Sequence, residues 1–324
     1  MSFTLVSHPG GMVFLDDDAQ YLQTLAWVLP AQWHAEFFLR TGDCLQYLQE
    51  QTAHWEARAW AQQRMVERWR EGSPLIPQVL AYWAQTPPEW QALTQVCAFD
   101  YLMPGLNGLQ ALAQLGSWQG ARALLTGQAD EQVAVQAFNQ GLIECFIPKQ
   151  LNDDPQHLIQ SLRQLMLRAH PRLEQIWRST LTAAQDALLR HAKVQADLAS
   201  YAQQHWVAHV VIGQPWGVLG LTDQGQATWL QLEQHADLPE LAELAQAQGL
   251  DDSVCLALER GEQLVSLELQ QALGEQASAL AQPAFAVGES LLGACFHIDP
   301  GCWHAGVNSR KAWLSNLGAR RVRD

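Results

Sequence analysis

The sequence contains few basic residues and a low share of charged residues overall. Lys and Arg number 19 against 33 Asp and Glu, which gives a formal net charge of −14 over 324 residues. Proteins that hold duplex nucleic acid do so largely by neutralising phosphates with Lys and Arg. No dense basic stripe occurs before the C-terminal end. The composition therefore disfavours a nucleic-acid partner.

The sequence also lacks long apolar runs and any export signal. No run approaches the roughly eighteen apolar residues that a membrane-spanning helix needs, so we expect no contact with a membrane. Residues 1–11 have no basic region followed by an apolar stretch, as a secretory signal would. The six cysteines are scattered, which favours reduced thiols in the cytoplasm.

Patterns of strand and helix alternate through the first half of the chain. Short apolar runs predict strands, which we place at residues 12–15, 35–39, 96–99, 121–125 and 143–147. Helical spacing lies between and after them, at residues 19–29, from 44 onward, and at 107–115, 130–140 and 155–168. This alternation predicts an α/β domain over residues 1–168, with a doubly wound, five-stranded parallel sheet.

One connection in this domain is unusually long. Between the second expected helix and the strand at 96–99 lies an insert at about residues 50–95, which favours helix because residues 44–70 contain no Gly or Pro. It carries five of the fourteen tryptophans: Trp55, Trp60, Trp69, Trp83 and Trp90. Two interpretations stay open, a helical addition held by packing or a surface for docking or dimerisation.

The second half of the chain shows a different pattern of predicted helices and strands. Residues 169–205 contain few helix breakers and predict one long connecting helix. Residues 206–324 predict an α+β output domain of unknown type. We expect its strands at 206–212, 217–221, 226–232, 254–257, 264–269, 285–287 and 291–298, and its helices at 238–248 and 308–316.

Polar residues follow four of the expected parallel strands. These residues are Asp16, Asp17, Asp100, Thr126 and Lys149. Ligands of such sheets sit beyond the carboxyl ends of the strands, so we expect the five side chains to meet there. Clustered carboxylates repel one another unless a cation lies among them, and Mg²⁺ prefers oxygen ligands of this kind. Together with an ammonium and a hydroxyl group, the set is suited to phosphoryl transfer.

The order of these residues resembles the receiver domain of bacterial two-component response regulators. The resemblance rests on Asp-x-x-Met-Pro-x-x-Asn-Gly at residues 100–108, with the acidic pair upstream and Thr126 and Lys149 downstream, and covers residues 10–168. Gln150 departs from the family, where proline is common, and so does Gly127, where alanine is usual. The insert is the largest departure.

The resemblance implies a role for each matching residue. Asp100 would accept the phosphoryl group, assisted by Thr126 and Lys149. The implied Mg²⁺ ligands are Asp16, Asp17, Asp100 and the backbone carbonyl of Leu102. Thr126 would be the switch hydroxyl and Phe146 the aromatic side chain that turns with it.

The resemblance also implies partners and an output. A sensor histidine kinase or a phosphotransfer protein would supply the phosphoryl group, and we expect a homodimer. The protein would act as a switch and not as an enzyme, signalling through residues 206–324 to a protein or a small ligand. An enzyme within residues 206–324, regulated by the receiver, is the alternative. A DNA-binding transcriptional regulator is less favoured, because of the charge.

A second cluster of metal-ligand residue types lies near the C-terminus. Cys295 and His297 precede the turn sequence at 299–301, and Cys302 and His304 follow it. On a hairpin the two pairs could face one another and form a zinc site. A cysteine on an apolar strand is more often part of the core, so both interpretations stay open.

Overall fold

The computed structural model describes residues 3–86, 92–127, 131–149, 155–168, 170–274, 279–299 and 322–323. The chain forms two compact units, each assembled from separate segments. The parallel-sheet unit comprises Pro9–Trp60, Pro87–His170 and Lys311–Asp324. The antiparallel-sheet unit comprises Met1–His8, Ala61–Thr86 and Pro171–Arg310.

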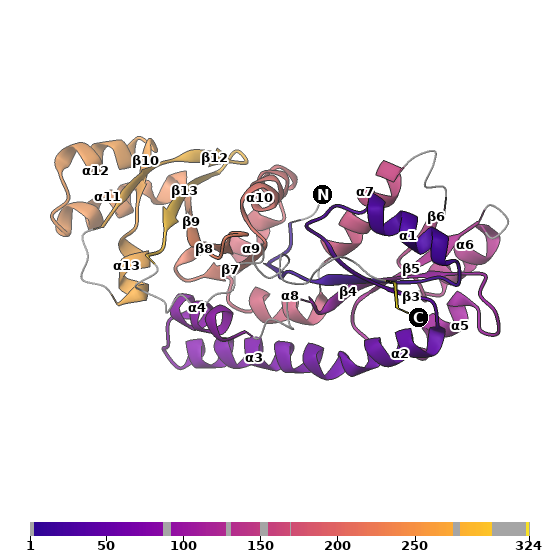
Figure 1. Cartoon of the computed structure of the whole chain (residues 1–324). Coiled ribbons are helices and arrows are strands. Elements are labelled where there is room, and N and C mark those ends of the chain that lie inside the picture. The colour runs from indigo at the N-terminus through magenta and orange to yellow at the C-terminus, as the bar shows by residue number, and fades with distance from the viewer. Residues whose placement is uncertain are drawn as a thin grey trace. The chain divides into compact units, whose positions relative to one another are not determined.

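The parallel-sheet unit is built on a six-stranded sheet (Figure 1). Its strand order is β14-β3-β2-β4-β5-β6, and every neighbouring pair is parallel. The strands are β2 (Gly11–Leu15), β3 (His34–Phe38), β4 (Thr94–Asp100), β5 (Ala121–Thr126), β6 (Cys145–Pro148) and β14 (Val322–Arg323). The five predicted strands are confirmed. Strand β14 was not predicted; it is a two-residue strand that pairs with β3 and lies in the basic tail.

Helices cover both faces of this sheet, which confirms the doubly wound α/β prediction (Figure 1). They are α1 (Ala19–Val28), α2 (Thr41–Glu50), α5 (Gly108–Gln114), α6 (Glu131–Asn139) and α7 (Pro155–Met166). On one face Leu25 of α1 and Leu158 of α7 pack with Phe14. On the other face Leu48 of α2 and Leu112 of α5 pack with other strand residues. Because apolar side chains project from both faces of each central strand, burial on both sides is the favourable arrangement.

The insert consists of α3 (Thr52–Arg70) and α4 (Leu75–Gln85) and is shared between the two units. The start of α3 belongs to the parallel-sheet unit, where Trp55 is buried in the core and stacks on His170. From Ala61 onward the insert belongs to the antiparallel-sheet unit, and the buried face of α4 includes Trp83. Two of the insert's tryptophans therefore serve packing, whereas Trp60 is 56% exposed.

The antiparallel-sheet unit contains a second six-stranded sheet, with the order β1-β7-β8-β9-β13-β12. Its strands are β1 (Val6–Ser7), β7 (Ala208–Gly213), β8 (Trp216–Leu221), β9 (Ala227–Gln234), β12 (Phe285–Val287) and β13 (Leu291–His297). The predicted strands in these regions and helix α11 (Leu238–Ala247) are confirmed. Strand β1 was not predicted, because two residues carry no readable periodicity.

Two strand predictions for this half of the chain are wrong in whole or in part. The region of the strands expected at residues 254–257 and 264–269 forms instead helix α12 (Asp252–Glu259), strand β10 (Gln263–Val265) and helix α13 (Leu267–Leu273). Strand β10 pairs with β11 (Ala281–Pro283). Short apolar runs fit a buried helical turn as well as a strand, which explains the error. The expected helix at 308–316 lies outside the described residues.

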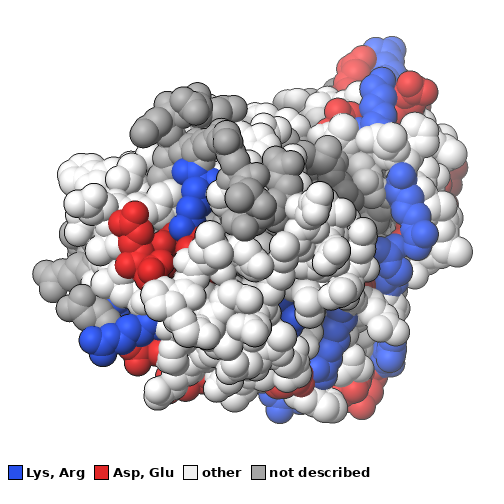
Figure 2. Space-filling model, turned by 90° about the vertical axis from the view of Figure 1, so that its right-hand side faces the viewer, with Lys and Arg blue, Asp and Glu red and all other residues white. Residues whose placement is uncertain are grey.

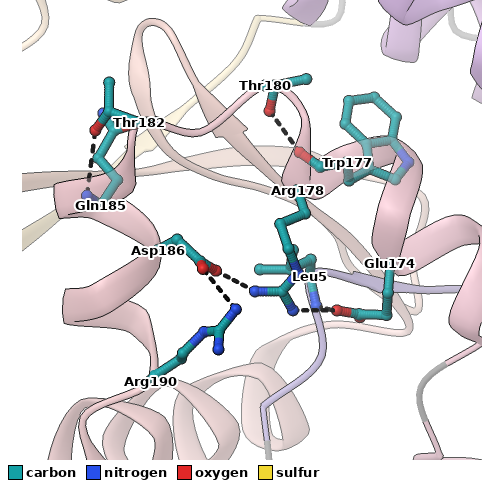
Figure 3. A network of polar contacts seen from close by, with 9 residues as sticks. All are labelled: Leu5, Glu174, Trp177, Arg178, Thr180, Thr182, Gln185, Asp186 and Arg190. Atoms are coloured by element: carbon teal, nitrogen blue, oxygen red, sulfur yellow. Dashed lines mark hydrogen bonds and ion pairs between the residues drawn. The ribbon is translucent and has the colours of Figure 1, made fainter.

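The expected connecting helix at 169–205 is three helices, α8 (Pro171–Arg178), α9 (Ala183–Leu189) and α10 (Ala192–His205). The break after α8 is stabilised locally, because Thr182 and Gln185 form a reciprocal capping box at the start of α9. A network of ion pairs joins α8 and α9, with Arg178 between Glu174 and Asp186, and Asp186 also paired with Arg190 (Figure 3).

The same network fixes the N-terminal segment. The backbone N–H of Leu5 donates to Oε1 of Glu174 at 2.7 Å, next to strand β1. On α8, Trp177 is 1% exposed and its indole N–H donates to Oε1 of Gln62 at 2.6 Å. These helices are therefore packed into the antiparallel-sheet unit and do not form a free stalk. None of the helices that the structure describes combines the length and apolar character needed to cross a membrane.

The burial of Trp177 leads to a stability prediction. Trp177→Ala leaves a cavity and removes the partner of Gln62, so the free energy of unfolding should fall by about 3–5 kcal/mol. The change in the free energy of unfolding is measured by urea denaturation, monitored by circular dichroism. Trp27→Ala is the matched control, because Trp27 is 89% exposed. Equal midpoints for the two variants would contradict the packing described here.

Candidate functional site

The carboxyl edge of the parallel sheet brings the predicted site residues together. Asp16 follows the last residue of β2, and Asp100 is the last residue of β4. Thr126 is the last residue of β5, and Lys149 follows the last residue of β6. Parallel pairing in register places these four strand ends at one edge of the sheet.

Three carboxylates form a compact acidic cluster at this edge. One oxygen from each of Asp16, Asp17 and Asp100 lies within 4.8 Å of the others. Asp16 and Asp100 are buried, whereas Asp17 is exposed. The cluster is therefore held by the sheet on one side and can be reached from solvent on the other.

Lys149 bridges the two buried carboxylates. Its Nζ lies 2.7 Å from Oδ2 of Asp16 and 2.7 Å from Oδ1 of Asp100. Its backbone N–H donates to the carbonyl oxygen of Thr126 at 3.0 Å, which fixes the start of the loop after β6. Burial acts to lower the pKa of Lys149, but the hydrogen bonds and charges of Asp100 and Asp16 outweigh it and raise the pKa. The side chain is therefore a fixed positive charge.

The buried carboxyl groups are unfavourable as anions. Burial raises the pKa of Asp16 and of Asp100, and the hydrogen bond from Lys149 offsets this effect only in part. A backbone hydrogen bond from Asp18 to Asp16, and one from Leu102 to Asp100, act in the same direction as Lys149. One ammonium group does not compensate this many desolvated negative charges, so the site favours an additional cation.

The Asn-Gly pair of the motif positions the loop that follows Asp100. Asn107 caps helix α5 and forms a capping box with Gln110. The N–H of Gly108 donates to the carbonyl oxygen of Tyr101 at 3.1 Å. A Cβ atom at Gly108 would lie 2.1 Å from the carbonyl oxygen of Asp100, which is too close. Only glycine lets α5 start this near the Asp100 backbone, and our sequence analysis did not assign this role.

The two predicted switch residues occupy different environments. Thr126 is buried at the end of β5, whereas Phe146 on β6 is 37% exposed. Leu102 is exposed in the loop after β4, and its backbone makes the hydrogen bond to Asp100. The roles of these three residues stay predictions.

A further residue of this edge was missed by the sequence analysis. Tyr21 lies in the first turn of α1, and the Nζ of Lys149 sits 5.0 Å from the centre of its ring. The motif includes no aromatic residue at this position, so no sequence signal pointed to it.

The predicted zinc ligands are only partly within the described residues. Cys295 and His297 lie on β13, while Cys302 and His304 lie outside the described part of the chain. The Cys295 thiol hydrogen bonds with Tyr201 and Thr228, and burial raises its pKa. Among the described residues, the acidic cluster at Asp16, Asp17 and Asp100 is the one group of three metal-ligand side chains. Zinc binding stays a prediction.

The close approach at Gly108 can be tested by substitution. Gly108→Ala forces the start of α5 away from Asp100, and the free energy of unfolding should fall by about 1–3 kcal/mol, as for other overpacked sites. Gly42→Ala is the control, because a Cβ there meets nothing within 4 Å and alanine favours helix. The measurement is thermal unfolding, and equal effects of the two substitutions would contradict this account.

The raised pKa of Asp100 gives a pH prediction. In metal-free buffer, Asp100→Asn should unfold at a higher temperature than the native protein near neutral pH, because the ionised carboxylate destabilises the folded state. A group whose pKa is raised on folding contributes stability below its unfolded pKa and loses it as the pH rises through the folded pKa. The difference should therefore shrink as the pH falls toward the ordinary range of Asp.

The measurement is the unfolding midpoint by calorimetry across that pH range. The exposed Asp43→Asn variant controls for the loss of one negative charge. A native midpoint at or above that of Asp100→Asn at every pH would contradict the prediction.

Comparison with known proteins supports the fold. The chain is similar over its whole length to the structure of the Legionella pneumophila response regulator LqsR, with a TM-score of 0.72, 20% identity and 98% of each chain covered. A response regulator receiver domain protein from Clostridium thermocellum is 16% identical, with a TM-score of 0.33, and covers 49% of this chain and 94% of that chain.

The signal receiver domain of an HD domain-containing protein from Pseudomonas fluorescens Pf-5 is also similar. It is 20% identical, with a TM-score of 0.31, and covers 49% of this chain and 94% of that chain. No protein-family model and no curated protein matches the sequence. The similarity over 98% of both chains shows that this protein has the fold of a response regulator.

Proposed function

We propose that this protein is a response regulator of a two-component phosphorelay, with Asp100 as the phosphoacceptor. The observation that carries the proposal is the convergence of three carboxylates and the Lys149 ammonium at the carboxyl edge of the parallel sheet. A buried carboxylate beside an ammonium group and a hydroxyl can act as a nucleophile toward phosphorus while its neighbours accept the incoming charge.

The acidic cluster fits Mg²⁺ by its donor chemistry and its spacing. Mg²⁺ is usually held by one or two carboxylates together with water and phosphate oxygens. Asp16, Asp17 and Asp100 offer such oxygens within 4.8 Å of one another, and exposed Asp17 leaves room for water. Leu102 would add its backbone carbonyl. Bound there, the ion would neutralise charge on the carboxylates and on the phosphoryl oxygens.

The residues of the chain account for the transfer itself. A carboxylate oxygen of Asp100 forms a new bond to phosphorus, while the bond between phosphorus and the donor breaks and the donor keeps the electron pair. Lys149, which already contacts Asp100, pairs with a phosphoryl oxygen. Thr126 donates its hydroxyl hydrogen to another oxygen, and its movement leaves space for Phe146 to turn.

The source of the phosphoryl group would be a sensor histidine kinase or a phosphotransfer protein. The antiparallel-sheet unit would transmit the signal by contacting a protein or a small ligand, in a cytoplasmic homodimer. We infer a switch without catalytic output of its own, and an enzyme within residues 206–324 stays the alternative. Charge argues against a nucleic-acid partner: on the face seen in Figure 2 the Lys and Arg side chains are scattered and form no broad basic area.

Labelling with a small phosphoryl donor tests the proposal. We expect phosphoramidate to phosphorylate the native protein in the presence of Mg²⁺, and Asp100→Asn to remain unlabelled, because it lacks the nucleophilic carboxylate. Lys149→Met should slow labelling about tenfold or more, since a charge-stabilising group is lost. The readout is a phosphate-affinity gel combined with intact mass.

Asp43→Asn, which changes an exposed acidic residue on α2, should label like the native protein. Chelation of Mg²⁺ should abolish labelling. If Asp100→Asn were labelled to the native extent, the assignment of the phosphoacceptor would be wrong.

A further inference from the structure

The position of Tyr21 is fixed at the start of α1. Its backbone N–H donates to Oδ1 of Asp18, the N-cap of α1, at 3.1 Å. This places the side chain in the first helical turn, directly after the acidic run. The ring then lies beside Lys149, whose Nζ is 5.0 Å from the ring centre. An ammonium group at this distance from an aromatic face is attracted to the ring.

The hydroxyl group of Tyr21 is buried without a hydrogen-bond partner among the described residues. Burial raises the pKa of this hydroxyl, and the negative charges of Asp16 and Asp100 raise it further, so the group stays protonated. A buried donor without an acceptor is unfavourable and is rare in folded proteins. This donor lies in the electrostatic field of the two carboxylates that would face the phosphoryl group.

A second tyrosine of the same unit shows the ordinary arrangement. Tyr47 on α2 packs against Phe38, and its hydroxyl has the side chains of Gln51 and Thr94 as hydrogen-bond partners. A tyrosine that only fills the core is expected to satisfy its hydroxyl in this way. Tyr21 differs, because its hydroxyl is unpaired and its ring lies 5.0 Å from Lys149 Nζ, the ammonium group that contacts Asp16 and Asp100.

We propose that Tyr21 is a further residue of the phosphoryl site: its ring holds the Lys149 ammonium, and its hydroxyl donates a hydrogen bond to an oxygen of the group carried by Asp100. This inference rests on the proposed function. An acceptor arriving on Asp100 would satisfy the buried donor, so phosphorylation would gain a hydrogen bond that the resting site lacks. Tyr21 would then favour the phosphorylated state selectively, with little effect on cation binding.

Beryllofluoride, an analogue of the phosphoryl group, allows this selectivity to be measured at equilibrium in the full chain. We expect Tyr21→Phe to weaken beryllofluoride binding about tenfold in the presence of Mg²⁺, which corresponds to one lost hydrogen bond to a charged group. Its affinity for Mg²⁺ alone should be unchanged. Tyr21→Leu should weaken beryllofluoride binding further, because Lys149 also loses the aromatic face. Titration calorimetry gives both affinities.

Tyr47→Phe is the matched control and should bind both Mg²⁺ and beryllofluoride like the native protein. Thermal unfolding identifies a variant that fails to fold, and Tyr21→Leu then replaces Tyr21→Phe, since it also lacks the hydroxyl and carries no hydrogen-bond donor. Native affinity of Tyr21→Phe for beryllofluoride would overturn the inference. So would an equal loss of affinity for Mg²⁺ and beryllofluoride, which indicates a general structural disturbance.

These outcomes differ from a failure of the proposed function itself. In that case the native protein would bind no beryllofluoride, or Asp100→Asn would bind it with native affinity. A native protein that binds the analogue, alongside a Tyr21→Phe variant that binds it equally well, removes Tyr21 from the site and leaves the assignment of Asp100 in place.

Discussion

The pairing of one ammonium group with two buried carboxylates governs the candidate site. Lys149 contacts Asp16 and Asp100 at 2.7 Å each, while burial keeps the pKa of both carboxyl groups raised. The site therefore holds more negative charge than its own residues neutralise. Binding of a cation would reduce the repulsion between these carboxylates and stabilise the sheet edge. The bound cation would also attract an anionic group to the same place.

The remainder of the parallel-sheet unit can be understood as support for that arrangement. Parallel strands bring the site residues to one edge, and Gly108 allows α5 to start within contact distance of the Asp100 backbone. Side chains such as Phe14 and Leu48 fill the cores on the two faces and keep the strand ends in register. Displacing one of the loops that carry the carboxylates would separate their charges and weaken the binding of a cation.

The sequence predicted this unit well because its strands are apolar throughout and end in chemically distinctive residues. Asp16, Asp100 and Lys149 could be placed at the carboxyl edge of the sheet from the sequence alone, since each follows or ends a predicted strand. Contacts between distant segments could not be predicted. Tyr21 faces Lys149 only once α1 is packed, and β1 and β14 are too short for periodicity to identify. In the second half, short apolar runs did not distinguish helix from strand, which produced the wrong strand prediction at residues 254–257.

The assembly of each unit from separate segments has a consequence for how the protein can be divided. Strand β1 belongs to one unit and β2 to the other, and helix α3 contributes to both. The backbone crosses from one unit to the other five times, after residues 8, 60, 86, 170 and 310. A fragment ending near residue 168 would retain Asp100, the proposed phosphoacceptor, but would leave part of the insert without the rest of the antiparallel-sheet unit. The parallel-sheet unit is therefore not one continuous segment of the chain and cannot be exchanged between proteins as a single piece.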